Sequence, residues 1–322
     1  MGCSMLPQSS VVRLPTAAVE SGSFRITCSV GNRFEYDTKH GKFLADRQGG
    51  SLDVLILGCG YTGEHVAKRF LVRGARVTAT GRNVQRLAGI GVEIISTKDL
   101  HAHVRPGMLV LHSIPPDGPA GLLDPLRDTA ARVVYLSSTA VYGSASLVNE
   151  TTPVDPATER ARARVEVERT IIDGPWSSLI LRPAAIYGPG RGVHESIRRG
   201  SYSLSERFVS RIHVEDLAAH VEAALLSAVC GAYPVADKEP CTSREIAEFC
   251  ARLLDLPVTD GGQLDTGRAP RFANNRRVDG SAIRRALGVT LVYPSYRAGI
   301  PAALTGEAVL PQSIVGEISA SS

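Results

Sequence analysis

The chain has 322 residues, of which 43% are hydrophobic, and a formal net charge of +4. This length and apolar content suit one large or two modest domains with a hydrophobic core, and so small a charge does not by itself indicate nucleic-acid binding. No run of about eighteen apolar residues predicts a transmembrane helix, and six cysteines without a CxxC pair favour reduced thiols over a disulfide or zinc framework.

The first 50 residues differ in composition from the rest of the chain. Up to Gly31 the only acidic residue is Glu20, and serine and threonine are frequent. Such a composition is typical of an organelle transit peptide, and we expect the chloroplast stroma. The alternatives are a mitochondrial location and a disordered extension of a cytosolic protein. We interpret residues 1–50 as transit peptide and polar linker, 51–303 as the folded domain and 304–322 as a flexible tail.

Residues 53–82 predict a strand, a glycine turn, a helix and a second strand. The apolar run 54–57 is too short for a helix and suits a strand buried on both faces. Apolar residues recur at helical spacing over 62–72, and residues 75–80 form the second strand. Between the first strand and the helix, the sequence GCGYTG has the spacing GxGxxG. This order of elements is the context in which the spacing indicates a dinucleotide site.

The three glycines of this turn have distinct expected roles. Gly58 permits the tight turn, Gly60 lets a pyrophosphate approach the backbone, and Gly63 allows the helix to pack closely on the strand. The phosphates would face the positive end of the helix. The alternative is a glycine-rich turn in an ordinary α/β protein. The predicted cofactor contacts in this turn are Gly58, Gly60, Tyr61, Thr62 and Gly63.

The end of the second strand selects the form of the cofactor. An acidic residue there would bind the ribose 2′-hydroxyl of NAD, but the sequence is Thr80-Gly81-Arg82-Asn83. Arg82 can pair with a 2′-phosphate, so we expect NADP, with NAD as the alternative. A solvated arginine at the start of the next helix is the other interpretation.

Two further strands are predicted at residues 92–96 and 108–113. A proline-rich loop, residues 114–119, follows the second of them. The carboxyl ends of strands line the ligand site of a doubly wound sheet, so Ser113 and Pro115 are expected to flank the cofactor. His101 and His103 lack a third ligand nearby and are interpreted as surface residues.

The next strand, residues 132–136, ends in the sequence SSTAVYG, and two later segments read LILRPAAIYGPGR (179–191) and RIHVEDLA (211–218). Together with the glycine turn, these segments resemble the extended short-chain dehydrogenases/reductases of the NAD-dependent epimerase/dehydratase group, in an atypical form that opens with GxGxxG. The resemblance covers residues 53 to about 300. It implies a doubly wound parallel α/β sheet of Rossmann type, with a small C-terminal substrate lobe from segments around 188–212 and 231–300. Pro183 would contact the cofactor.

The chain departs from this family at the active site. The family uses a Ser or Thr after the fifth strand and a YxxxK motif on the following helix. Ser138 matches the hydroxyl position, but the helix 158–172 carries Arg160 at the tyrosine position and Arg164 at the lysine position. None of the nine tyrosines has a lysine four residues later. Arginine stays protonated and cannot act as a general base.

Tyr142 and Tyr187 are the candidate substitute acids, because each lies just beyond a strand end. Arg160 would lower the pKa of such a tyrosine or hold an anionic substrate group, and Arg164 would bind the ribose or a phosphate. The alternatives are that the tyrosines pack against loops and that the arginines form a solvated helix face.

The remaining sequence predicts the second lobe. Helices are expected at 214–226, at 243–254 with a capping box of Thr242 and Glu245, and lastly at 279–287. A strand is expected at 232–236, and the loop 260–275 is expected to lie over the site. The basic cluster of Arg276, Arg277, Arg284 and Arg285 lacks interleaved aromatic residues, so the sequence does not favour nucleic acid as a partner.

Two classes of function remain open. The first is an NADP-dependent oxidoreductase or nucleotide-sugar epimerase that works without YxxxK on a small molecule, with a nucleotide sugar or another anion as the candidate substrate. The second is a non-catalytic NADP-binding sensor or assembly protein. The sequence predicts no metal and no membrane association, and it leaves a homodimer open.

Overall fold

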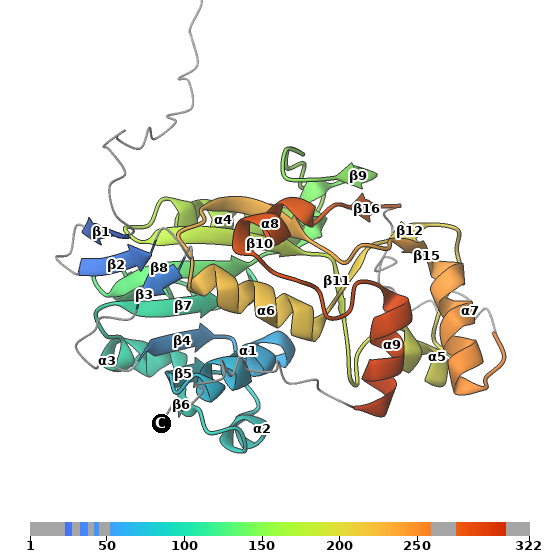
Figure 1. The fold of residues 1–322 in the computed structure, drawn as a ribbon, viewed down its shortest axis with the longest axis horizontal. Helices are drawn as coiled ribbons and strands as arrows, with labels where there is room; N and C mark the ends of the chain where they lie inside the picture. Colours follow the sequence, from blue (N-terminus) through green and yellow to red (C-terminus); the bar gives the residue numbers. More distant parts are fainter. Residues whose placement is uncertain (1–22, 28–32, 38–41, 45–51, 259–274, 307–322) are drawn as a thin grey trace, which may run out of the picture.

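The computed structural model describes residues 23–27, 33–37, 42–44, 52–258 and 275–306 (Figure 1). Three predicted segments lie wholly or mostly outside the described residues: the transit peptide and linker at 1–50, the loop at 260–275 and the tail from residue 307. Within the described residues, no helix is both long and apolar enough to cross a membrane.

A seven-stranded parallel sheet forms the centre of the molecule. Its strand order is β14-β10-β8-β7-β4-β5-β6, and every adjacent pair is parallel. The strands are β4 (Asp53–Leu57), β5 (Arg76–Thr80), β6 (Glu93–Ile95), β7 (Met108–His112), β8 (Ala130–Leu136), β10 (Ser177–Pro183) and β14 (Gly231–Val235). This order confirms the predicted doubly wound α/β fold.

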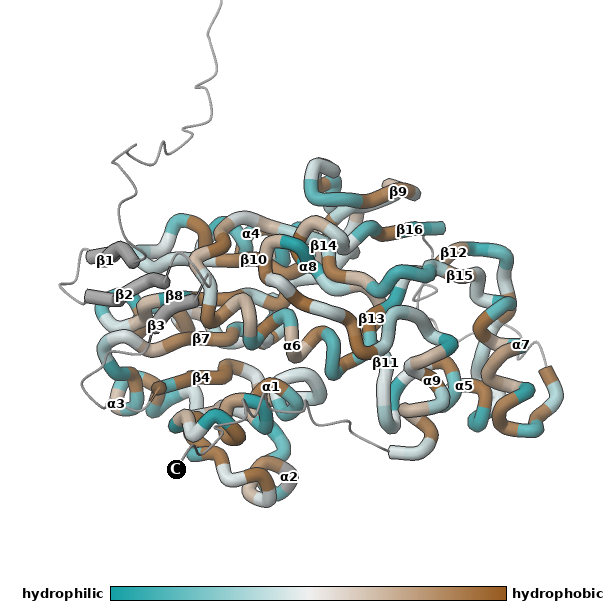
Figure 2. Tube along the Cα trace, viewed as in Figure 1, coloured by the Kyte–Doolittle hydropathy of each residue, from teal (hydrophilic) through white to brown (hydrophobic). Residues whose placement is uncertain are grey.

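Helices cover both faces of this sheet. The helices on the two faces are α1 (Tyr61–Val72), α2 (Val84–Ala88), α3 (Leu100–His103), α4 (Glu159–Ile172), α6 (Val214–Leu225) and α8 (Ser281–Leu287). Along β4, Val54 and Ile56 belong to the core beneath α1 and α6, while Leu55 and Leu57 belong to the core on the opposite face. Both faces of the strand are therefore buried, as its unbroken apolar run predicts. Figure 2 shows the hydrophobic colouring along β4 and β7.

A smaller lobe follows the carboxyl end of β10. Its helices are α5 (Val193–Arg198), α7 (Ser243–Leu254) and α9 (Tyr296–Thr305), which gather at the right of Figure 1 around a separate core. Short strand pairs accompany it: β11 (Ala185–Tyr187) with β13 (Arg211–His213), β12 (Phe208–Val209) with β15 (Cys241–Thr242), and β16 (Arg277–Val278) with β9 (Leu147–Val148). The predicted capping box of Thr242 and Glu245 is present at the start of α7.

Two elements differ from the sequence prediction. The helix at 281–287 is not the last, because α9 follows it and reaches Thr305. An antiparallel three-stranded sheet of β1 (Ser23–Thr27), β2 (Arg33–Asp37) and β3 (Lys42–Leu44) lies within the first 50 residues. The polar linker predicted at 33–50 therefore contains regular structure.

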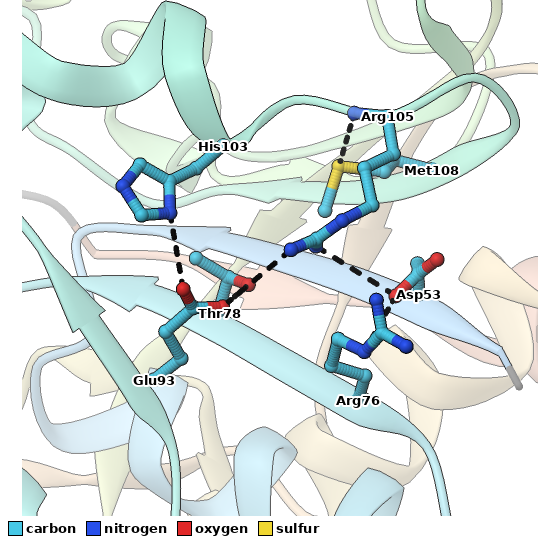
Figure 3. Close-up of polar contacts among 7 residues, drawn as sticks. All are labelled: Asp53, Arg76, Thr78, Glu93, His103, Arg105 and Met108. Carbon is cyan, nitrogen blue, oxygen red and sulfur yellow. Dashed lines mark hydrogen bonds and ion pairs between the residues drawn. The ribbon is translucent and has the colours of Figure 1, made fainter.

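A network of polar contacts connects residues at the amino ends of the central strands (Figure 3). The glycine turn follows the carboxyl end of β4, at the opposite end of the sheet's strands. The guanidinium of Arg105 lies 3.8 Å from Asp53 and 3.9 Å from Glu93. Glu93 also accepts a hydrogen bond from Thr78 and contacts His103 at 3.0 Å. The Thr78 hydrogen bond contributes most to lowering the pKa of the Glu93 carboxyl. His103 thus has a structural partner, and the described residues contain no group of three potential metal ligands.

Candidate functional site

The glycine turn lies where the strand order reverses. β5 and β7 pair with opposite sides of β4, the position at which doubly wound proteins bind ligands. Gly58 adopts φ +83°, which favours glycine. A Cβ atom on Gly58 would lie 2.8 Å from Cγ1 of Ile114 and 2.9 Å from the backbone nitrogen of Ile114. Conformation and space therefore both exclude a side chain here.

Hydrogen bonds from the neighbouring strand ends fix this turn. The backbone nitrogen of Gly58 donates to Oγ1 of Thr80 at 3.0 Å, and that of Cys59 donates to the carbonyl of Thr80 at 2.6 Å. On the other side, the hydroxyl of Ser113 donates to the carbonyl of Gly58 at 2.6 Å. Ser113, a predicted cofactor contact, is thus positioned beside the turn and holds its shape.

The other two glycines of the turn differ in their surroundings. A Cβ atom on Gly60 would meet only the carbonyl oxygen of Gly58, at 4.0 Å, so the space beside Gly60 is open. A Cβ atom on Gly63 would lie 3.2 Å from Cγ2 of Ile56 and 3.4 Å from Sγ of Cys59. The pattern fits a diphosphate cradle: open space at the amino end of α1, with close packing of helix on strand behind it.

Arg82 follows β5 at the edge of this cradle. Its side chain is exposed, and it forms no hydrogen bond or ion pair with the described part of the chain. No carboxylate occupies the residues that end β5, Thr80 to Asn83. The guanidinium is therefore available to a ligand at the position where doubly wound proteins read the adenosine ribose.

The loop after β7 borders a pocket of about 170 Å³. Pro115 and His112 line it from the loop, and Val167 and Thr170 line it from α4. His112 is buried, and this burial lowers its pKa to about 4, so its imidazole is neutral near pH 7. The pocket lies between the loop that follows β7 and helix α4.

Ser138 begins the short 3₁₀ helix η3 (Thr139–Tyr142) beyond β8. Its Oγ accepts a hydrogen bond from the backbone nitrogen of Ala140 at 3.2 Å, and the residue is half-buried. The hydroxyl proton of Ser138 is thus left for another acceptor. The neighbouring Ser137 is buried, and its Oγ has no hydrogen-bond partner in the described ranges.

Arg276 fixes this segment from the other lobe. Its buried guanidinium donates to the carbonyl oxygen of Ala145 at 3.0 Å and also to those of Thr139 and Gly143. The backbone nitrogen of Arg276 donates to the carbonyl of Phe208 at 2.8 Å. Through its backbone and its side chain, Arg276 therefore connects β12 to the loop that follows Ser138.

Tyr142 lies in the protein interior. Its side chain is fully buried, and its hydroxyl accepts a hydrogen bond from Nη1 of Arg182 at 3.2 Å. Arg182 is itself held by both carboxylate oxygens of Glu168, at 2.6 and 3.1 Å. Burial raises the pKa of Tyr142, and the hydrogen bond from Arg182 offsets this only in part. The pKa of Tyr142 is thus raised in the folded protein, and its catalytic role remains a prediction.

Tyr187 belongs to the core of the smaller lobe. Only 2% of its surface is exposed, and its hydroxyl donates to the carbonyl of Ser295 at 3.2 Å. Its ring packs edge-on against His213, and a Cβ atom on Gly299 would lie 2.1 Å from its hydroxyl oxygen. Burial, and then the nearby Asp237, raise the pKa of Tyr187. These contacts give Tyr187 a structural function, and its catalytic role remains a prediction.

The two arginines of α4 have different environments. Arg160 is exposed, whereas Arg164 is half-buried and its charge acts on the buried hydroxyl of Tyr135 in β8. Burial raises the pKa of Tyr135 more than Arg164 lowers it. Pro183, a predicted cofactor contact, is the last residue of β10 and so lies at the carboxyl end of that strand. The arginines therefore do not form one uniform solvated face.

The basic cluster predicted at 276–285 is divided by the fold. Arg276 is used by backbone carbonyls, and the guanidinium of Arg277 lies 3.5 Å from the ring centroid of Phe208. Arg284 donates to the carbonyl of Ala236 at 2.6 Å, while Arg285 is exposed. Three of the four side chains thus have internal partners, which argues against a shared nucleic-acid surface.

Comparisons with known proteins agree with this geometry. The model described as "NAD dependent epimerase/dehydratase family" matches residues 116–227. Protein YeeZ of Escherichia coli (strain K12) is 30% identical over 271 residues, covering 75% of this chain and 96% of that protein. The chain belongs to the NAD dependent epimerase/dehydratase family.

Two further similar proteins extend this result. The structure of a functionally unknown conserved protein from Silicibacter pomeroyi DSS is 30% identical, with a TM-score of 0.69, and the match covers 80% of this chain and 99% of that one. The 3-diazoavenalumate denitrifying reductase of Streptomyces sp is 27% identical over 211 residues, or 57% of this chain and 69% of that protein. Similarity thus extends over most of the epimerase/dehydratase domain.

Sequence reasoning missed two residues at this site. Arg276 had been grouped with its basic neighbours, because the sequence does not show which arginine is buried. Arg191 was quoted only as part of a family segment, yet its guanidinium lies 5.2 Å from the ring centroid of Tyr61 in the glycine turn. The sequence GPGR, with two glycines beside a cation, was the available signal for Arg191.

Proposed function

We propose that the protein is an NADP-binding oxidoreductase or epimerase-like enzyme of the atypical extended short-chain dehydrogenase/reductase group. The observation that carries the proposal is the glycine turn. Its geometry forbids a side chain at Gly58 and leaves open space at Gly60, next to the amino end of α1. A nicotinamide dinucleotide, when bound, would supply the hydride acceptor or donor.

The chain's own residues would hold and orient the reactants. The turn 58–63 would bind the diphosphate through backbone N–H groups, and Arg82 the adenosine ribose with its 2′-phosphate. The free hydroxyl proton of Ser138 would orient a substrate carbonyl. The exposed Arg160 would attract an anionic substrate group, such as the phosphates of a nucleotide sugar.

The cofactor preference gives the first test. Arg82→Ala should weaken NADPH binding by about ten- to a hundredfold, because a charge-assisted hydrogen bond contributes about 1.5–3 kcal/mol. NADH, which has no 2′-phosphate, should bind the variant and the wild type alike. Calorimetric titration of both cofactors measures these affinities. Equal binding of NADPH and NADH to the wild type would remove the NADP assignment.

A specific observation favours a second candidate function, a non-catalytic NADP-binding sensor or assembly protein. The hydroxyls of Tyr142 and Tyr187 are both buried with raised pKa values and internal partners. Arginine at both motif positions on α4 supplies no proton donor near neutral pH. An enzyme would oxidise NADPH with at least one carbonyl or nucleotide-sugar substrate, whereas a sensor would bind NADPH tightly and oxidise none.

We also propose a cellular location and a division of the chain. Residues 1–50 would direct the protein to the chloroplast stroma, and residues 51–303 would act as the catalytic domain with its substrate lobe. The composition of the first 31 residues supports the targeting proposal. A homodimer is also proposed.

A further inference from the structure

The loop after β11 rests directly on the glycine turn. Residues 188 and 191 exchange two backbone hydrogen bonds, of 2.9 and 3.0 Å, which close a tight turn. The hydroxyl of Tyr61 donates to the carbonyl of Pro189 at 3.1 Å. A Cβ atom on Gly188 would lie 2.6 Å from that hydroxyl oxygen, so only glycine permits the contact. This loop of the smaller lobe is therefore fixed against the first residue of α1.

Arg191 brings a positive charge to this contact. Its guanidinium carbon lies 5.2 Å from the centroid of the Tyr61 ring, within the range of a cation–π interaction. Tyr61 follows Gly60 directly and begins α1, so the stacked guanidinium lies at the amino end of that helix. A cation beside the positive end of a helix is unfavourable, unless an anion lies between them.

No carboxylate of the described chain supplies that anion. The side chain of Arg191 is exposed and forms no ion pair within the described ranges. The acidic residue in the first turn of α1, Glu64, accepts a hydrogen bond from Lys68 at 3.0 Å, and Glu215 of α6 contacts His65 at 2.7 Å. Arg191 thus stacks on the ring of Tyr61, the residue that follows the open position Gly60, without an ion pair inside the described residues.

We propose that Arg191 binds the diphosphate of the cofactor and closes the substrate lobe onto the glycine turn. This inference rests on the proposed function and adds a residue from outside the βαβ unit to the cofactor site. Backbone N–H groups and the helix end would hold the diphosphate from one side, and the guanidinium stacked on Tyr61 would hold it from the other. Because the same loop belongs to the substrate lobe, a bound diphosphate would also fix that loop.

The test compares ligands with and without a diphosphate. ADP, 2′-AMP and NADPH are titrated calorimetrically into the full chain and into the variants Arg191→Ala and Arg191→Lys. Arg191→Ala should weaken ADP and NADPH binding by about ten- to a hundredfold and leave 2′-AMP binding unchanged. Arg191→Lys keeps the charge but loses the planar stacking on Tyr61. Its affinity for ADP and NADPH should therefore lie between those of the wild type and Arg191→Ala.

Arg198→Ala is the matched control. Arg198 is an exposed arginine of α5 that pairs with Glu195 at 2.9 Å, so its removal changes the net charge equally without touching the turn. If the wild type binds ADP and the two variants Arg191→Ala and Arg198→Ala bind it equally well, the role of Arg191 is overturned while the proposed function stands. A wild type that binds neither ADP nor NADPH would overturn this role and the proposed function together. Should Arg191→Ala lose its native melting transition, the Lys variant decides by the same comparison.

Discussion

At the scale of single residues, Asp237 gives the sharpest electrostatic prediction. It is 2% exposed, and its Oδ2 has no hydrogen-bond partner among the described residues. Burial raises the pKa of this carboxyl to about 8. The folded state then binds a proton that the unfolded state releases near pH 4, so stability is present at low pH and is lost as pH rises toward 8. Asp237→Asn should remove this loss.

The expected effect of Asp237→Asn depends on pH. The free energy of unfolding should rise by a few kcal/mol at pH 8, because one pKa unit corresponds to about 1.4 kcal/mol, and should change little at pH 4. Urea denaturation at both pH values measures it. Asp279→Asn is the control, because the Asp279 carboxylate accepts a hydrogen bond from Ser281 that lowers its pKa. The control should lose stability at pH 8, and a loss in both variants would contradict the account of Asp237.

The roles of individual side chains were the least predictable part of the site. Gly58 and Gly63 were predicted with their reasons, because a turn's backbone demands are local. Tyr187 was not: its hydroxyl partner, Ser295, is more than one hundred residues away in the chain. Whether a tyrosine at a strand end faces solvent or a second lobe depends on such distant packing. Sequence alone therefore predicted the backbone demands of the glycine turn but not the surroundings of Tyr187.

At the scale of elements, agreement follows the strength of local signals. The helix predicted over 158–172 is observed as α4, which begins at Glu159, and the side chain of its N-cap Thr158 accepts a hydrogen bond from the backbone nitrogen of Ala161. The capping box of α7 was likewise predicted from two residues three positions apart. In contrast, α9 was missed because it contains Gly299 and Pro301, which weaken a helical pattern. Packing of Tyr296 and Ile300 into the core of the smaller lobe compensates for these residues.

The strand pairs of the smaller lobe could not be predicted in the same way. β9 and β16 contain two residues each and pair across more than one hundred positions. The alternation of apolar and polar residues that marks a strand cannot be recognised in two residues. The local sequence of a strand also does not show which distant strand it pairs with. The central sheet was predictable because its apolar runs alternate with helices, which leaves few topologies.

At the scale of the whole molecule, buried histidines set the response to acid. His112, His213 and His220 are each at most 5% exposed, and burial lowers the pKa of each to about 4. Between pH 6.5 and 4 the unfolded state binds protons that the folded state does not, so stability falls as pH falls. Each histidine contributes up to about 3 kcal/mol over this interval.

Asp237 and Asp216, whose pKa values burial raises, act in the opposite direction, but the histidines with lowered pKa values, which include His194, outnumber them. The free energy of unfolding should therefore be highest near pH 6.5 and fall steeply toward pH 4. Denaturation curves at intervals of half a pH unit would reveal this profile. A flat profile from pH 6.5 to 4 would show that the histidines are not held neutral.

The central claim is that the glycine turn binds the diphosphate of a nicotinamide dinucleotide. Gly60→Ala tests it most directly, because the added methyl group enters open space and meets only the Gly58 carbonyl oxygen at 4.0 Å. The variant should keep the melting temperature of the wild type. Its NADPH affinity, measured by calorimetric titration, should fall at least about tenfold, because the methyl group occupies the path of the diphosphate. Equal NADPH affinity in Gly60→Ala and the wild type, or a wild type that binds no dinucleotide, would contradict the account.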